Sequence, residues 1–211
     1  HASYRRQRQM CIRDRLIRGL DDAIVWAGNY DKNLNITDFF SVQGEIGTRV
    51  LESINIELAL QERQLIESAP TLNSDAYKAH VNGRDVRLYG SGVMGRESLE
   101  RMANLQREAT ILDSTFSDAW AFLGLSHLDL YAYQHDKRPE RIDSMKYCLE
   151  RAMKLNPNSA LPHQFFARYY STVANDLVAS QRHLRRAREL SGPNSIQPVS
   201  YTHLRAHETV V

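Results

Sequence analysis

Apolar helical stretches of this chain repeat at a fixed interval. Each carries a ring-bearing residue that recurs every 43 residues: Tyr77, Trp120 and His163. A set of small residues follows the same 43-residue step and then a 35-residue step: Ala109, Ala152 and Ala187. Self-similarity at such a period is typical of stacked helical repeats, which mainly present surface to partner proteins. The repeat therefore favours an interaction protein over an enzyme.

The part of the chain after residue 73 is predicted to be helical throughout. Apolar residues recur there at helical spacing in six stretches, separated by polar or turn-forming segments. Turn-forming pairs follow the second, fourth and sixth stretches: Asp113-Ser114, Asn156-Pro157 and Gly192-Pro193. The predicted helices span residues 74–88, 96–112, 117–134, 138–154, 160–174 and 176–190. Two helices per unit give three units.

Residues 16–57 have a different, α/β character. An apolar, β-prone run at residues 23–28 is followed by a turn-rich segment, and a helix is predicted from Thr37 onward. No second convincing strand follows, so we expect this strand to pair with upstream sequence that the chain lacks. A polar stretch with Pro70 and Asn73 ends the piece, and residues 58–73 are predicted to be a linker.

The middle helical unit carries the clearest motif. Trp120-x-x-Leu123-Gly124-x-x-His127 resembles the first-helix pattern of the tetratricopeptide repeat, with His127 where a tyrosine is usual. The resemblance implies three tetratricopeptide-like repeats over residues 74–197, wound into an α-α superhelix. That repeat normally has about 34 residues, so the first two units carry extra residues between their helices. HEAT and armadillo repeats have longer periods and are the structural alternative.

The tetratricopeptide resemblance also implies a concave groove, lined by first helices, that binds a peptide or helix of a partner protein. In the middle unit the implied groove positions are Asp118, Ala121, Leu125, Leu128 and Asp129. In the third unit they are Leu161, Gln164, Arg168, Ser171 and Thr172. Repeat ends that lack a neighbour expose an apolar face, so self-association through such an end is a further expectation.

The segment before the repeats carries a second resemblance. Residues 25–34 place Trp26, Tyr30 and Asp31 near the end of a strand, and the following helix contains Phe40-x-x-Gln43-x-Glu45-Ile46. This arrangement resembles the C-terminal strand and helix of a TolB-like domain. Such domains precede tetratricopeptide arrays in bacterial signalling or transcription-regulatory proteins, often downstream of a cyclase, winged-helix or kinase domain. The resemblance implies the bacterial cytoplasm or periplasm, with any membrane tether in an upstream segment.

The two ends of the chain resemble translated sequencing-library adapter. The N-terminal match covers residues 5–15 and is rich in arginine, and the C-terminal match covers residues 199–209. We therefore leave residues 1–15 and 198–211 out of the fold prediction; the alternative is a basic arm for nucleic acid or targeting. Without these ends the chain has 21 basic and 23 acidic residues, a net charge of −2. The positive charge of the whole chain therefore does not indicate a nucleic-acid partner.

A glycine-rich sequence offers an alternative of another class. Gly90, Gly92 and Gly95 form a literal G-x-G-x-x-G ahead of a predicted helix, and Asp113 follows 23 residues after Gly90. In a nucleotide-dependent enzyme, such glycines would let backbone N–H groups hold a pyrophosphate while Asp113 bound the ribose. The simpler interpretation is an insertion between two repeat helices, because no alternating strand–helix pattern follows. A strand that ended at Gly90 in a parallel sheet would favour the enzyme.

The other chemistry-bearing residues fit structural roles better than catalytic ones. The histidines between the excluded ends show no spacing typical of a zinc site: His80, His127, His135, His163 and His183. Cys148 is the single cysteine left, and we expect a buried, inert thiol. Arginines crowd the last predicted helix, where a solvated face is the expected role: Arg182, Arg185, Arg186 and Arg188. We therefore predict no catalytic residue, metal or other cofactor, and no apolar run approaches the ~18 residues of a membrane span.

Overall fold

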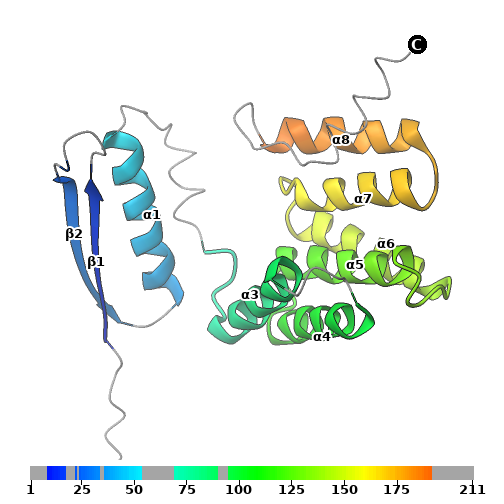
Figure 1. Ribbon diagram of the computed structural model, residues 1–211, viewed down its shortest axis with the longest axis horizontal. Helices are drawn as coiled ribbons and strands as arrows, with labels where there is room; N and C mark the ends of the chain where they lie inside the picture. The colour runs from blue at the N-terminus through cyan, green and yellow to red at the C-terminus, as the bar shows by residue number, and fades with distance from the viewer. Residues whose placement is uncertain are drawn as a thin grey trace, which may run out of the picture. The chain divides into compact units, whose positions relative to one another are not determined.

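The computed structural model describes residues 9–17, 22, 24–33, 36–53, 69–89 and 95–191. It divides into two compact units, His1–Ser74 and Asp75–Val211, which are taken separately below (Figure 1). Within the described residues the chain is mainly α-helical, with a single pair of strands in the first unit. None of the described helices is long and apolar enough to cross a membrane.

The first unit is a β-hairpin covered by one helix. Strand β1 (Gln9–Ile17) pairs antiparallel with β2 (Ile24–Asn33), and helix α1 (Ile36–Ser53) packs against β2. Phe40 and Val42 of α1 are buried. The predicted strand and helix are confirmed, but β2 continues to Asn33 through residues predicted to form a turn. The expectation that the strand would pair outside this chain is also wrong. An unpaired strand leaves backbone groups unsatisfied, and here β1 supplies the partner, although most of it lies within the adapter-like residues 1–15.

The second unit consists of six helices among the described residues, and all six predicted helices are confirmed with ends within two residues. Their bounds are α3 (Ser74–Tyr89), α4 (Arg96–Leu112), α5 (Ser117–Ala132), α6 (Glu140–Leu155), α7 (Leu161–Thr172) and α8 (Leu177–Ser191). Consecutive helices pack as antiparallel pairs, and the pairs follow one another along the chain (Figure 1). This arrangement is consistent with a helical array.

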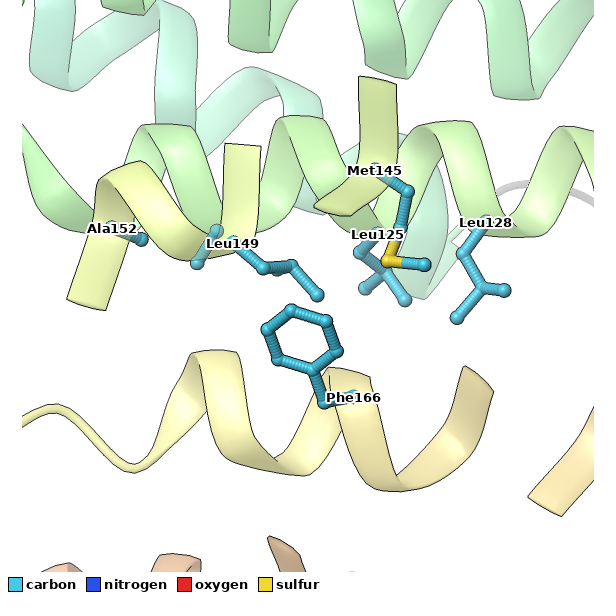
Figure 2. Packing of buried hydrophobic residues seen from close by; sticks show 7 residues of the cluster. Leu125, Leu128, Met145, Leu149, Ala152 and Phe166 are labelled. Carbon is cyan, nitrogen blue, oxygen red and sulfur yellow. The ribbon is translucent and has the colours of Figure 1, made fainter. Parts of the chain in front are cut away.

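Helix α5 lies at the centre of the second unit. It contacts α4, α6 and α7, and eleven of its fourteen residues from Ser117 to Leu130 are buried, because neighbouring helices pack on several of its sides. Figure 2 shows the main core cluster, which joins three helices: Leu125 and Leu128 of α5, Met145, Leu149 and Ala152 of α6, and Phe166 of α7. Burial of each large side chain contributes about 1.5–3 kcal/mol. The core therefore holds the second hairpin and the third together.

The connections between successive hairpins repeat the same turn. Asp113 Oδ1 accepts a hydrogen bond from the backbone N–H of Thr115 at 2.8 Å, and Asn156 Oδ1 accepts one from that of Asn158 at 3.1 Å. The two capping residues are themselves 43 residues apart. Short polar side chains of this kind favour turns because they bond to the backbone two residues on. The repeat therefore extends to the loops.

A carboxylate organises the loop between α5 and α6. Asp136 accepts hydrogen bonds from Arg138 Nη2 at 2.6 Å and from Arg141 Nε at 2.7 Å. These two guanidinium groups, with Arg138 the stronger influence, hold the pKa of Asp136 well below its usual range. Arg141 Nη1 also lies 2.9 Å from His127 Nδ1 on α5. The loop is thereby joined to the helix that it leaves.

Candidate protein-binding face

The structure buries most of the predicted groove positions on α5. The side chains of Ala121, Leu125 and Leu128 lie in the core cluster, and the Asp129 side chain is 0% exposed. Asp118 is half-buried near the first turn of the helix. Because α7 packs directly on α5, the apolar side chains at these positions contact neighbouring helices instead of an open groove.

The predicted positions on α7 are more accessible. Leu161, Gln164, Arg168 and Ser171 are half-buried, and Thr172 is exposed. The Ser171 and Thr172 hydroxyls both donate to the backbone carbonyl of Arg168, at 3.0 and 2.8 Å, so they serve their own helix. Equivalent positions of the 43-residue repeat are therefore mostly buried on α5 and mostly half-buried on α7.

One pair of predicted positions forms an ion pair between the two helices. Arg168 Nη2 lies 2.6 Å from Asp129 Oδ1, and the Arg168 side chain is 22% exposed. The guanidinium carbon of Arg168 is also 6.0 Å from the ring centroid of Tyr133, which is largely exposed at the end of α5. Arg168 thus links a buried carboxylate to a surface ring.

Three aromatic rings cross the first helices of successive hairpins. The ring centroids of His80 on α3 and Phe122 on α5 are 5.3 Å apart, and those of Phe122 and Phe165 on α7 are 5.4 Å apart. Both contacts are edge-to-face, a favourable geometry for aromatic pairs. We call His80, Phe122 and Phe165 the aromatic row. Phe122 and Phe165 are half-buried and are separated by the 43-residue step, so equivalent residues of neighbouring repeats touch each other.

The α3 end of the row rests on a buried polar pair. His80 Nδ1 lies 2.8 Å from Gln106 Oε1, and Gln106 Nε2 donates to the His80 backbone carbonyl at 3.1 Å. Burial is the main cause that lowers the pKa of His80 to about 4. A neutral imidazole can therefore donate from Nδ1 to the amide oxygen at neutral pH, and the ring is fixed against Phe116 as well, with centroids 4.9 Å apart.

A cation and a carboxylate lie beside the aromatic row. The guanidinium carbon of Arg84, on exposed α3 surface, is 5.4 Å from the Phe122 ring centroid. Burial raises the pKa of Asp118, and the nearby Arg84 opposes that rise. Half-buried rings with an adjacent cation and acceptor can bind apolar and polar groups of a peptide together. The prediction located Asp118 and Arg168 in this region, but it did not name Phe122 or Arg84.

The signal for Phe122 was present in the sequence. A step of 43 residues leads from Phe122 to Phe165, so the repeat places a phenylalanine at equivalent positions of two neighbouring units. Arg84 had no comparable signal, because its position depends on how α3 packs beside α5.

The cysteine and the histidines noted in the sequence are accounted for by packing and contacts within the fold. Cys148 is buried, and burial raises the pKa of its thiol to about 12, so the thiolate is not formed at neutral pH. His163 and His183 bring their Nδ1 atoms to 3.0 Å between α7 and α8. Within the described residues, no group of three or more His, Cys, Asp or Glu side chains could hold a metal ion.

The glycine-rich sequence lies between two helices. Residues 90–94 fall outside the described part, but α3 ends at Tyr89 and α4 begins at Arg96. A dinucleotide-binding loop follows a strand of a parallel sheet. The described residues before Gly90 are helical instead, which is the arrangement expected for an insertion between repeat helices.

A scan of the chain against protein-family models and a search of curated proteins found no match in either case.

Proposed function

We propose that the second unit is a tetratricopeptide-type interaction module that binds a peptide or helix of a partner protein along the aromatic row. The observation that carries this proposal is the contact of His80, Phe122 and Phe165 across α3, α5 and α7. Half-buried aromatic residues supply much of the binding energy of protein interfaces.

Charged groups on both sides of the row would orient such a partner. Arg84 lies over Phe122, and Arg168 is held beside Tyr133 by Asp129. Guanidinium groups offer several hydrogen-bond donors in a fixed plane, so they suit carboxylate and carbonyl oxygens of a peptide. The proposed binding face thus differs from the one implied by the family pattern: Ala121, Leu125 and Leu128 lie in the core cluster, the half-buried rings of Phe122 and Phe165 pack against it and form the surface, and the buried His80 supports Phe122.

The repeat motif supports the family assignment that this proposal uses. Trp120, Leu123 and Gly124 occupy α5, and antiparallel helix pairs follow in the order that tetratricopeptide units require. In the first unit, β2 followed by α1 has the order expected for the end of a TolB-like domain. We accordingly propose a non-catalytic part of a bacterial signalling or transcription-regulatory protein.

Peptide selection on the full chain tests the proposal. A phage-displayed random peptide library is panned on the protein, and the affinity of enriched peptides is measured by fluorescence anisotropy. Arg84→Glu should weaken binding by about tenfold or more, whereas Arg101→Glu, which changes another exposed arginine, on α4, should leave it unchanged. Equal loss in both variants, or a library that yields no binder, would argue against this face.

A further inference from the structure

The outer face of α8 is strongly basic. Within Leu177–Ser191 there are four arginines and one acid, Glu189. All four arginines are exposed: Arg182, Arg185, Arg186 and Arg188. The opposite side of the helix buries Ala179, Leu184 and Ala187, so packing leaves the arginines on the solvent side.

Few of these cations have a partner within the fold. Arg186 forms an ion pair with Glu189 at 2.9 Å. Among the described residues, no ion pair within 4.0 Å involves Arg182, Arg185 or Arg188. At the start of the same helix, the Val178 side chain is 79% exposed. The face therefore combines unneutralised charge with an apolar contact point.

The most exposed residues of α6 carry three acids and one lysine, whereas its other charged residues, Arg141, Lys146 and Arg151, are half-buried. Exposed residues recur on the outer face of α6 at positions i, i+3, i+7, i+10 and i+14: Glu140, Asp143, Tyr147, Glu150 and Lys154. In the described part of the chain, its three acids form no ion pair within 4.0 Å. Tyr147 is 61% exposed, and its ring packs edge-on against Trp120 with centroids 5.9 Å apart. This face offers carboxylates around a fixed aromatic ring.

The two faces occupy equivalent places in the repeat. The 35-residue step that leads from Ala152 to Ala187 also leads from Tyr147 to Arg182 and from Glu150 to Arg185. Two exposed positions of α6 that are not basic are thus occupied by arginine at the equivalent positions of α8. A single chain therefore presents an acidic and a basic helix face, each complementary to the other.

We propose that two copies of this chain associate by placing the α8 face of one copy against the α6 face of the other. Arginines then meet carboxylates, an arginine can stack on the ring of Tyr147, and Val178 adds an apolar contact. When both copies exchange these faces, one two-fold interface contains the complementary contact twice. The association is electrostatic, so it weakens as salt screens exposed charges.

Charge reversal on each face, followed by mixing, tests the proposal on the full chain. One variant carries Arg182→Glu, Arg185→Glu and Arg188→Glu, and the other carries Glu140→Lys, Asp143→Lys and Glu150→Lys. All six side chains are exposed, so both variants should keep the wild-type circular dichroism spectrum. The matched control reverses two exposed charges of α4, Arg101→Glu and Glu108→Lys.

Sedimentation equilibrium at about 50 mM and about 500 mM salt is the measurement. The wild type and the α4 control should approach twice the 24.3 kDa chain mass at low salt and dissociate at high salt, with at least about a tenfold weaker affinity. Each reversed variant alone should stay monomeric, and the equimolar mixture should dimerise, because its faces are again complementary. A monomeric wild type, dimers in either variant alone, or a mixture that stays monomeric would each overturn the proposal.

Discussion

The hairpins α5–α6 and α7–α8 occupy equivalent places in the repeat, but they fill their helix crossings differently. In α5, Gly124 lies at the crossing, and a Cβ there would come within 2.8 Å of Leu149 Cδ2 and 3.2 Å of the Met145 backbone oxygen. The residue 43 positions later is Ala167, which is buried with its Cβ in place. The two helices of the middle hairpin therefore approach too closely for a side chain at position 124, whereas the last hairpin accommodates the Cβ of Ala167.

The residue of the second helix that faces each crossing shows the opposite size difference: it is large in the middle hairpin and small in the last one. Met145 of α6 is replaced after the 35-residue step by Ser180 of α8, whose hydroxyl donates to the Ala167 carbonyl at 2.9 Å. Around it, the rings of Phe166, Tyr170 and His183 stack on one another, with centroids between 5.1 and 6.3 Å apart. The repeat thus determines which positions meet, whereas the side chains at each contact differ from unit to unit.

The largest expected difference concerns the leucine at each crossing. Leu149→Ala should lower the free energy of unfolding by about 2–5 kcal/mol, because it leaves a cavity in the cluster that joins three helices. Leu184→Ala, 35 residues later, should cost less, since α8 packs against α7 alone among the major helix contacts. Urea denaturation of both variants provides the measurement. An equal or reversed order would mean that the two crossings are energetically alike.

Acid should act on the histidines of both hairpins. Burial is the main cause that lowers the pKa of His127 and of His183 to about 4, and nearby arginines add to the effect. In the unfolded chain these histidines have a pKa of about 6.5 and become protonated, whereas in the folded chain they stay neutral down to about pH 4. The free energy of unfolding therefore falls as the pH drops from about 6.5 to about 4.

His183→Phe separates the contribution of the last hairpin. Phenylalanine keeps the stack on Phe166 and Tyr170 but does not titrate, so the variant should lose about 1–2 kcal/mol less stability than the wild type between pH 7 and pH 4. Urea titrations at a series of pH values measure this. An unchanged pH dependence would show that His183 is not a source of the acid sensitivity.

An exchange of the small residues tests the crossings directly. Gly124→Ala should destabilise the protein by about 1–2 kcal/mol, because overpacking against Leu149 outweighs the gain in helix propensity. The reverse change, Ala167→Gly, should cost about 0.5–1 kcal/mol, mainly through backbone entropy. Thermal denaturation compares the two. A stabilising Gly124→Ala would show that the middle hairpin has room for the Cβ.

The smallest effect is expected from the serine of the last crossing. Ser180→Ala removes a buried hydrogen bond between α8 and α7 and should cost about 0.5–1.5 kcal/mol. Ser126→Ala is the matched control, since the Ser126 hydroxyl donates to Phe122 within its own helix at 2.8 Å. Its replacement should change the free energy of unfolding by less. Equal costs would mean that the bond between helices has no special value.

The helices were predictable because their apolar period is local, and the ends of all six array helices were found within two residues. The proposed binding face was less predictable. The family pattern assigned Leu125 and Leu128 to a groove, yet aliphatic residues at these positions pack on α7, while the polar Gln164 and Arg168 at third-unit groove positions remain accessible. Contacts such as that between His163 and His183 depend on how α7 packs on α8, and the repeat period does not predict that packing.

The ion pair between Asp129 and Arg168 gives the units a fixed order. The 43-residue step carries Asp129 to Thr172 and Leu125 to Arg168, so neither repeat contains both charges. A slide of α7 along α5 by one turn, about 5.4 Å, would separate the charges and leave a buried carboxylate without this cation. If α5 and α7 exchanged places, Thr172 and Leu125 would occupy the positions of Asp129 and Arg168. Repeats that look alike by period are therefore not interchangeable, and each is matched to one neighbour.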